Sequence, residues 1–410
     1  MQNSYSRLWA VLGVLAVALA ALLVAMPAAA SHKDTTIVIW TDQDRQAAMT
    51  KLATEWASAK GVTAKVVVKD FGSIRDNLGT VSAADAPDVF NAAHDWTGQL
   101  AANGLVEPLY PSRATLKQFP SYTLNAFSYG TAVKKLYGIP VAVENIGLVV
   151  NTKLAKVPTT FAQLESEALA FKKKSHQPFG IAVQQGANGD AYHMYPFFSG
   201  LGGYIFGTNK AGNLDPSDIG VANPTFLKNA HLIDKWNKEG LINSKLDYTG
   251  AMNAFLKKQA AFWITGPWNT DTLKKSGLSF KIIQVPAIAK ASVPFLGVQG
   301  VMVSKYATTH GVDAAAKDFV NFLSTPAAQT QLAAANGRPP ANIQAKSNDP
   351  VLAQFSAASK GGVPMPNIPQ MSSVWSDLGQ AWVRSTKGAG AMTASKSFKG
   401  AARAIADKIG

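Results

Sequence analysis

The 410-residue sequence contains no cysteine, and its 25 aspartate and glutamate residues are far fewer than its 39 lysine and arginine residues. The absence of cysteine excludes disulfides, thiolate metal sites, a thiol nucleophile and a lipid attached to an N-terminal cysteine. The scarcity of carboxylates leaves a formal net charge of +14. Because the longest basic run is only residues 172–174, we interpret this charge as solvated surface, suited to acidic surroundings or an anionic envelope. We expect no nucleic-acid partner.

Several catalytic motifs are missing as well. The sequence has no His-Glu-x-x-His, no Gly-x-Ser-x-Gly and no Gly-Lys dipeptide, which excludes the corresponding metalloprotease, hydrolase and P-loop sites. The six histidines show no metal-ligand spacing, and the glycines at 200–203 lack the spacing of a dinucleotide fingerprint. We therefore expect neither a metal nor a cofactor.

The only long apolar run lies at the start of the chain. Residues 1–30 carry a single charge, Arg7, then an apolar stretch, and end in Pro27 and three alanines. This pattern predicts a secretory signal peptide, cleaved after Ala30. An uncleaved anchor is the alternative, because about 20 apolar residues span a bilayer. Without a lipid-bearing cysteine, we expect an exported protein in a periplasm or at the outer face of the cytoplasmic membrane.

After the signal, the pattern predicts alternating strands and helices. A chain this long favours two domains. The first part predicts strands at 35–40, 64–69 and 88–93, a helix with Met49, Leu52, Ala53 and Trp56 on one face that ends at Gly61, and a short helix near 73–84. This alternation favours an α/β fold with a mostly parallel sheet covered by helices on both faces.

The pattern restarts after residue 140. We expect a strand at 145–151, a helix opened by a capping box of Thr160 and Gln163, a helix at 249–258, a strand at 260–265 and a helix between Pro326 and Gly337. Ligands in such folds bind beyond the carboxyl ends of the strands, so polar and aromatic residues at those positions are candidates for a site.

Carboxylates and aromatic rings gather at these strand ends. They are Asp42, Asp44 and Arg45 after the first strand, Asp95 and Trp96 after the third, then Glu144, Asp190, Tyr192, Trp268 and Trp375. Each alone has a structural explanation, as a helix cap or a core residue. Together they suit a sugar, whose C–H face stacks on aromatic rings and whose hydroxyls bond to charged groups.

The segment 363–376, VPMPNIPQMSSVWS, holds three prolines ahead of Trp375. Proline fixes its own φ and favours extended geometry in the residue before it, so we expect neither a helix nor a central strand here. We interpret the segment as a rigid loop that holds Trp375 in the site and thereby reduces the ordering cost of binding.

Several motifs together resemble one family. They are TIVIW (36–40), PDVFNAAHD (87–95), GLVEPL (104–109), YGIPVAVE (137–144), YPFFSGLGGYIF (195–206), ITGPW (264–268), VPFLGV (293–298) and, most specifically, MPNIPQM (365–371). Over nearly the whole mature chain the sequence resembles the maltose/maltodextrin-binding proteins, the solute receptors of ABC sugar importers. GPW and PVAVE alone indicate only the wider class of sugar-binding receptors.

The resemblance implies a type II periplasmic-binding-protein fold with two lobes, three crossings and a cleft between the lobes. The crossings would lie near 143–147, 296–300 and 347–350. Lobe one would comprise 31–143 and 299–346, and lobe two 144–298 and 351–410. The implied protein is a monomer that binds maltose or maltodextrin by hinge closure and delivers it to the membrane subunits of an ABC transporter.

The resemblance also implies roles for individual residues. Asp44 and Arg45, with Asp42 nearby, would contact the sugar from the first loop, and Asp95 and Glu144 would accept hydroxyls. Asp190 stands where the family has a glutamate, Tyr192, Trp268 and Trp375 would be stacking rings, and Met365 would lie beside them.

Three positions depart from the family pattern. Ala92 stands in place of a tryptophan, Trp96 in place of an arginine, and Gly379 in place of a cleft arginine. One hypothesis is that Trp96 replaces the stacking surface lost at Ala92. The alternatives are a receptor for a different oligosaccharide and a secreted glycoside hydrolase, which also uses paired carboxylates.

Overall fold

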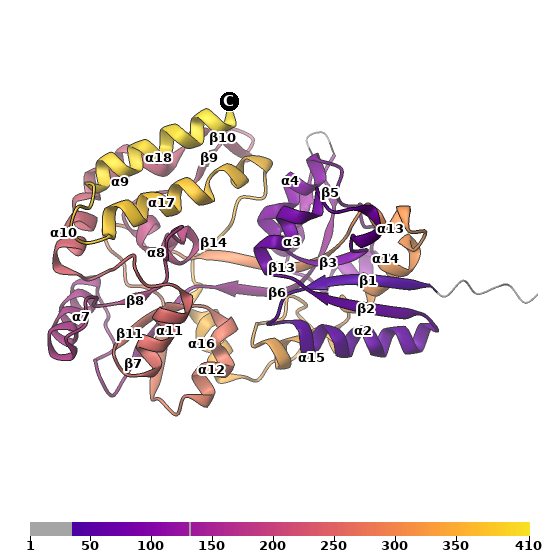
Figure 1. The fold of residues 1–410 in the computed structure, drawn as a ribbon, viewed down its shortest axis with the longest axis horizontal. Helices are drawn as coiled ribbons and strands as arrows, with labels where there is room; N and C mark the ends of the chain where they lie inside the picture. The colour runs from indigo at the N-terminus through magenta and orange to yellow at the C-terminus, as the bar shows by residue number, and fades with distance from the viewer. Residues whose placement is uncertain (1–34, 131–132) are drawn as a thin grey trace, which may run out of the picture.

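Two long strands run between the two halves of the molecule in a computed structural model that describes residues 35–130 and 133–410. They are β6 (Gly138–Asn145) and β13 (Phe295–Val303), and the other elements group on either side of them (Figure 1). The predicted signal peptide, residues 1–30, lies outside the described residues. Within the described ranges, no helix is long and apolar enough to cross a membrane.

The first half is built on a six-stranded sheet. Its other strands are β1 (Thr36–Thr41), β2 (Thr63–Val68), β3 (Val89–Ala93) and β14 (Val363–Pro364). The order is β14-β13-β3-β1-β2, with β6 also paired to β13. β1 is parallel to both β2 and β3, as the alternation of strands and helices predicts, whereas β13 runs antiparallel to β3 and β6.

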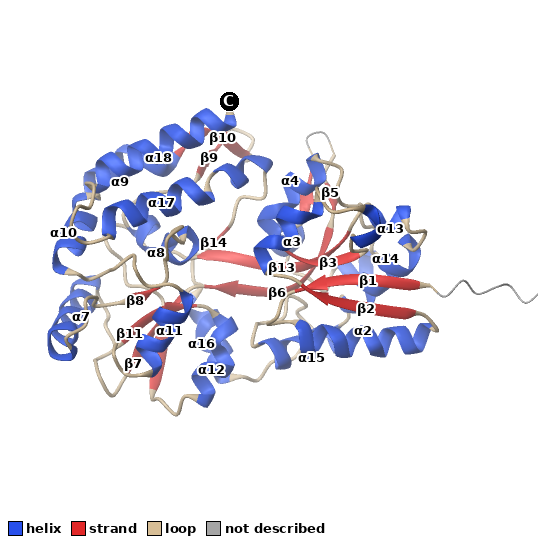
Figure 2. Cartoon of the chain, in the orientation of Figure 1, coloured by secondary structure: helices blue, strands red, loops and turns tan. Residues whose placement is uncertain are grey.

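Both faces of this sheet are buried, because alternate side chains of a strand point to opposite faces. Ile37 and Ile39 of β1 belong to a core covered by α2 (Gln46–Lys60), α14 (Asp313–Leu323) and α15 (Pro326–Asn336). Trp40 points to the other core, under α3 (Phe71–Leu78) and α4 (Thr97–Ala102). Figure 2 shows these helices flanking the strands.

The second half has a four-stranded sheet in the order β12-β7-β11-β8. These strands are β7 (Gly147–Asn151), β8 (Ala182–Val183), β11 (Phe262–Thr265) and β12 (Phe280–Ile283). β7 is antiparallel to both β11 and β12, and only β8 and β11 are parallel. This sheet is therefore mostly antiparallel, unlike the mostly parallel sheet expected from the first part of the chain.

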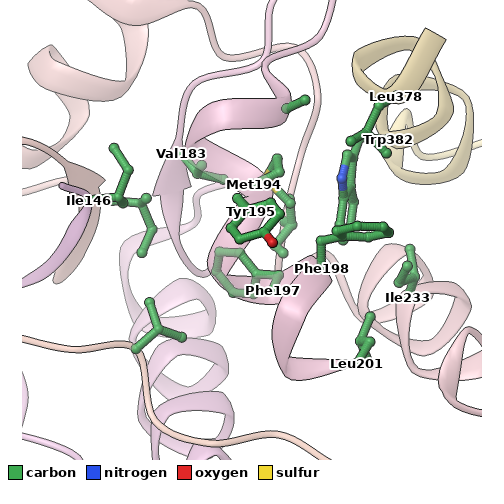
Figure 3. Packing of buried hydrophobic residues seen from close by; sticks show 14 of the residues in the cluster. Ile146, Val183, Met194, Tyr195, Phe197, Phe198, Leu201, Ile233, Leu378 and Trp382 are labelled. Atoms are coloured by element: carbon green, nitrogen blue, oxygen red, sulfur yellow. The ribbon is translucent and has the colours of Figure 1, made fainter. Parts of the chain in front are cut away.

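Aromatic side chains fill the larger core of this half. Helices α7 (Phe161–Ser175), α8 (Ala191–Gly200), α10 (His231–Glu239), α17 (Trp375–Thr386) and α18 (Ala394–Ile409) pack over one face of the sheet. Figure 3 shows Met194, Tyr195, Phe197 and Phe198 of α8 close to Trp382 of α17. The opposite face is covered by α11 (Tyr248–Leu256), α12 (Thr270–Lys275) and α16 (Pro350–Ala358).

The remaining elements are short. The strands are β4 (Ser128–Tyr129), β5 (Lys135–Leu136), β9 (Phe206–Thr208) and β10 (Leu214–Ile219), and the helices are α5 (Arg113–Leu116), α6 (Ser121–Ala126), α9 (Pro224–Asn229) and α13 (Tyr306–Thr309). The 3-10 turns are η1 (Ala83–Asp85), η2 (His94–Trp96), η3 (Gly220–Ala222), η4 (Pro267–Asn269) and η5 (Pro369–Ser373).

Most predicted boundaries agree with the structure. Gly61 ends α2, and Gly337 ends α15. The side chain of Thr160 accepts from Gln163 N–H at the start of α7. The helix expected near 73–84 is instead α3 followed by η1, and the strand expected at 145–151 is β7, separated from β6 by Ile146.

The proline-rich segment is more regular than its prolines suggest. Val363–Pro364 form β14 at the edge of the first sheet, Pro369–Ser373 form a 3-10 turn, and Trp375 begins α17. The side-chain amide of Asn367 donates to three backbone carbonyls of the first half, at Asn125 (3.0 Å), Ala126 (2.9 Å) and Ser128 (3.0 Å). Since α17 packs in the second half, the segment connects the two halves.

We predict that Asn367→Ala lowers the free energy of unfolding by about 1–3 kcal/mol, because the three carbonyls lose their shared donor. Urea unfolding followed by circular dichroism measures the change. Asn103→Ala, at an exposed position after α4, is the matched control and should stay within about 0.5 kcal/mol of wild type. Equal stability of the two variants would contradict this role for Asn367.

Candidate functional site

A cleft of about 850 Å³ lies between the two halves. Its walls come from loops after β1, β2 and β3 on one side, and from α8, η4 and the start of α17 on the other. All eleven residues selected from the sequence line it: Asp42, Asp44, Arg45, Asp95, Trp96, Glu144, Asp190, Tyr192, Trp268, Met365 and Trp375. The structure thus brings the whole predicted set together, while contact of each residue with a ligand stays a prediction.

The loop after β1 supplies a buried ion pair. Arg45 pairs with Asp42, whose Oδ1 also accepts from the Arg45 backbone N–H at 3.2 Å. The Arg45 guanidinium lies over the ring of Phe71, 4.9 Å from its centroid. Burial, followed by the nearby charge of Arg338, lowers the pKa of Arg45 from its ordinary value. Asp44, in contrast, is exposed.

Trp96 reaches the cleft with little of its surface, since only 5% of it is exposed. Its ring packs against Phe71, with centroids 4.7 Å apart, and the Arg75 guanidinium lies 5.8 Å from its centroid. Phe71 is the more exposed of the two rings. The hypothesis that Trp96 supplies a stacking surface in place of Ala92 therefore stays a prediction.

Asp95 joins the two walls directly. Its Oδ2 accepts a hydrogen bond from Trp375 Nε1–H at 3.0 Å. Burial raises the pKa of the Asp95 carboxyl to about 6, against the opposing effects of this hydrogen bond and the charge of Arg75. The carboxyl group is thus buried beside an indole, where ionisation is costly.

The start of α8 is organised by Asp190. Its Oδ1 accepts from the His193 backbone N–H (2.9 Å), and its Oδ2 accepts from Gln184 Nε2–H (2.6 Å) and lies 2.9 Å from His193 Nδ1. Burial acts to raise the pKa of Asp190, but the charge and hydrogen bonds of His193 outweigh it, and the net shift is downward. Tyr192 follows, and burial together with Glu144 raises its pKa well above the ordinary value.

Close backbone packing explains the glycine at 379. A Cβ at Gly379 would lie 3.0 Å from the carbonyl oxygen of Asn188 and 3.2 Å from the carbonyl carbon of Gly189, and a Cβ at Gly189 would lie 2.2 Å from the carbonyl oxygen of Gly379. α17 therefore lies directly against the loop that leads into Asp190. The position that holds a cleft arginine in the resembled family is used here to seat this loop.

Trp268 is positioned by the glycine two residues before it. A Cβ at Gly266 would lie 2.2 Å from Cζ3 of the indole, so only glycine lets the ring fold back over the turn. Tyr192 and His193 lie beside this ring, with centroids 6.3 Å and 5.5 Å away. Trp268 and Trp375 are both partly exposed, which leaves two indole surfaces open to the cleft.

Glu144 lies at the base of the cleft and is buried between two donors. Gln299 Nε2–H donates to its Oε1 at 2.7 Å, and Arg338 Nε–H donates to its Oε2 at 2.8 Å. Arg338 also lies 3.6 Å from Asp44 Oδ2. Burial acts to lower the pKa of Arg338, but Glu144 and the two aspartates outweigh it, so the net shift is upward. An unpaired buried charge is costly, and these two donors supply the partners that Glu144 needs.

Sequence reasoning missed several cleft residues. Lys69, Asp70 and Phe71 follow β2 directly, so the strand-end rule that selected the loops after β1 and β3 would have found them. Gln299 is a polar residue inside the otherwise apolar strand β13, and this contrast could have marked it as a candidate site residue. Arg338 follows a helix and carries no such signal. The other missed lining residues include Gln43, Arg75, Gln184, His193 and Tyr248.

The chemistry of the cleft is that of a binding site for a ligand with both apolar faces and polar edges. Two indoles offer flat surfaces, and charged or amide groups surround them. Within residues 35–130 and 133–410, no cluster of histidine and carboxylate side chains is arranged to hold a metal ion.

Comparison with known protein families identifies one family that covers most of the chain. A model described as bacterial extracellular solute-binding protein matches residues 51–358, more than half of the chain. The chain belongs to this family. As a solute-binding protein it is not an enzyme, so the glycoside hydrolase alternative is wrong.

Individual relatives agree with the fold. The galactooligosaccharide-binding protein of Bacillus subtilis (strain 168) is 28% identical over 86% of this chain and 85% of its own. The maltotriose-binding protein of Pyrococcus abyssi (strain GE5 / Orsay) is 29% identical over 72% and 64%. The Thermus thermophilus maltotriose binding protein, solved with maltotriose, has a TM-score of 0.80 and 27% identity over 91% of this chain and 100% of its own. The solute-binding protein therefore has the periplasmic-binding-protein α/β fold, as predicted.

We predict that Asp95→Asn becomes increasingly stable relative to wild type as the pH rises from 4 to 7. The folded-state pKa of Asp95, about 6, lies above the ordinary 3.8, so the folded protein binds the proton more tightly and wild type loses stability over this range. The unfolding free energy of Asp95→Asn minus that of wild type should rise by about 2–3 kcal/mol between pH 4 and pH 7, as measured by urea unfolding at both pH values. If the unfolding free energy of the variant minus that of wild type stays constant or falls over this range, Asp95 has no raised pKa.

Proposed function

We propose that this solute-binding protein is the oligosaccharide receptor of an ABC importer, with maltose and maltodextrins as its ligands. The observation that carries the proposal is the pair of partly exposed indoles, Trp268 and Trp375, in a cleft whose polar groups are mostly charged. Aromatic faces stack on the C–H side of sugar rings. Charged hydrogen-bonding groups hold the hydroxyls, whose burial without partners costs about 1–3 kcal/mol each.

Two sugar classes compete for the finer assignment. Maltotriose is named for the relatives from Pyrococcus abyssi and Thermus thermophilus, and galactooligosaccharide for the relative from Bacillus subtilis. The MPNIPQM segment and the aromatic set favour the maltodextrin class. Ala92, Trp96 and Gly379, which depart from that class, keep a galactooligosaccharide or another oligosaccharide as the second candidate.

The proposed mechanism is hinge closure. Lobe one would be 31–143 and 299–346, and lobe two 144–298 and 351–410, with crossings near 143–147, 296–300 and 347–350. A sugar that contacts both lobes favours the closed state, because only that state offers both sets of contacts at once. The closed monomer, exported by its signal peptide, would then dock on the membrane subunits of the transporter.

Titration of the intrinsic tryptophan fluorescence tests the ligand assignment. We expect a saturable change with maltotriose at one sugar per protein, a smaller affinity for maltose, and no response to trehalose. A response to a β-1,4-linked galactotriose alone would make the second candidate correct. No fluorescence change with any oligosaccharide in the panel would contradict the receptor function. In a separate incubation with maltodextrin, shortened products would contradict a pure binding role.

Trp375 variants test how the cleft holds the sugar. We predict that Trp375→Ala weakens maltotriose binding at least about 10-fold, as expected for an aromatic anchor. Trp375→Phe keeps an aromatic face and loses the bond to Asp95, so it should retain more affinity than the alanine variant. Tyr110→Ala, an exposed aromatic outside the cleft, is the control and should bind as wild type. Equal binding by Trp375→Ala and wild type would exclude this indole as a platform.

A further inference from the structure

Glu144, which the family resemblance assigns to sugar binding, is already occupied by the protein. Both of its carboxylate oxygens accept from buried side chains, Oε1 from Gln299 at 2.7 Å and Oε2 from Arg338 at 2.8 Å. The exposed fraction of Glu144 is only 6%. Both partners are themselves nine-tenths or more buried, with 5% of Gln299 and 6% of Arg338 exposed.

The two partners each have one polar atom left over. Gln299 Oε1 and Arg338 Nη1 are buried and have no hydrogen-bond partner in the part of the chain that the structure describes. Gln299 and Arg338 both line the cleft, and the Arg338 guanidinium lies 6.0 Å from the centroid of Trp268. A buried acceptor and a buried charged donor without partners are costly unless a ligand completes them.

The backbone fixes the position of Gln299. β13 pairs with β6 in regular register up to Gln299, which lies opposite Ala142, but the next residue, Gly300, lies opposite Pro140. This irregularity makes Val141 the extra residue, and such bulges re-aim side chains next to sites. The amide is therefore directed toward Glu144 and the cleft by the sheet itself.

Arg338 is fixed from the other edge of β6. The Val143 N–H donates to the Pro339 carbonyl at 2.9 Å, and the Ala341 N–H donates to the Val141 carbonyl at 3.3 Å. On the preceding side, the Thr270 hydroxyl donates to the carbonyl of Gly337 at 3.2 Å. Arg338 is thus fixed on both sides. Pro339 and Ala341, which follow it, pair with β6, and Gly337, which precedes it, contacts Thr270 of the second half.

The geometry points to Arg338 and Gln299 as the residues that contact the sugar at the base of the cleft, with Glu144 acting as a positioning residue that orients both. Arg338 Nη1–H donates to a hydroxyl oxygen, and Gln299 Oε1 accepts the proton of the same or a neighbouring hydroxyl. This inference rests on the proposed function. It assigns hydroxyl recognition next to Trp268 to a donor and an acceptor, in place of a carboxylate that only accepts.

Two matched substitutions separate contact from support. Arg338→Lys keeps a cation for Glu144 and loses the open Nη1 of the planar fork. Gln299→Lys keeps a donor for Glu144 and loses the open carbonyl. We expect each to weaken maltotriose binding about 10- to 100-fold, measured by calorimetry, with the melting temperature of each variant recorded to verify folding. Arg113→Lys on exposed α5 and the exposed Gln259→Lys are the controls and should bind as wild type.

Deoxy sugars give the readout that a purely structural role would not change. In one of the monodeoxy maltotrioses, the hydroxyl that Arg338 binds is missing. Wild type should bind this analogue at least about 5-fold more weakly than maltotriose. Arg338→Lys should lose less than about 2-fold, because the variant no longer makes that interaction. If both lysine variants bind maltotriose as tightly as wild type, or every deoxy analogue loses the same factor in variant and wild type, the inference is wrong.

The outcome for wild type separates this inference from the function on which it rests. If wild type binds the oligosaccharide and both lysine variants bind it equally tightly, Arg338 and Gln299 are not contact residues, and the receptor function is still supported. If wild type binds galactotriose and not maltotriose, the same variants and its deoxy analogues are measured with galactotriose. Absence of any oligosaccharide binding by wild type overturns both.

Discussion

The structure depends on the burial of one carboxylate where the two crossing strands meet. Glu144 is buried at the base of the cleft between two donors, Arg338 and Gln299, and removing one partner of a buried charge typically costs about 3–5 kcal/mol. To supply these donors, the chain brings together a bulged β6, the neighbouring β13 and the residues that pair with the far edge of β6. The same contacts join the two halves, so the polar base of the cleft lies where β6 and β13 run between them.

Function follows from what this base leaves open. The paired charges are satisfied, while a buried amide oxygen and a buried guanidinium nitrogen lack partners and two indoles are partly exposed in the cleft. A sugar satisfies all of these at once, whereas a purely apolar or purely charged ligand satisfies only some of them. Because these groups come from both halves, the proposed hinge closure would bring all of them to one ligand.

Much of the site was predictable because it follows local rules. Asp42, Arg45 and Asp95 lie at the carboxyl ends of parallel strands. The ITGPW motif carried Trp268, and the proline-rich segment 363–376 carried Trp375. The positions of Arg338 and Gln299 were not predictable in this way, because they arise from tertiary pairing. One is a register shift between β13 and β6, and the other is an edge contact to β6 made by residues about 200 positions apart in the sequence. The sequence also made no prediction of the direction of β7, since strand order and direction in the second sheet are set by long-range contacts.

The most direct test is a crystal structure of the protein with its tightest-binding oligosaccharide. The account predicts closed lobes, sugar rings stacked on Trp268 and Trp375, and hydroxyls bonded to Arg338 Nη1 and Gln299 Oε1, with Glu144 still holding both side chains. A sugar bonded directly to Glu144, with Arg338 and Gln299 turned away, or a sugar bound outside this cleft, would contradict it.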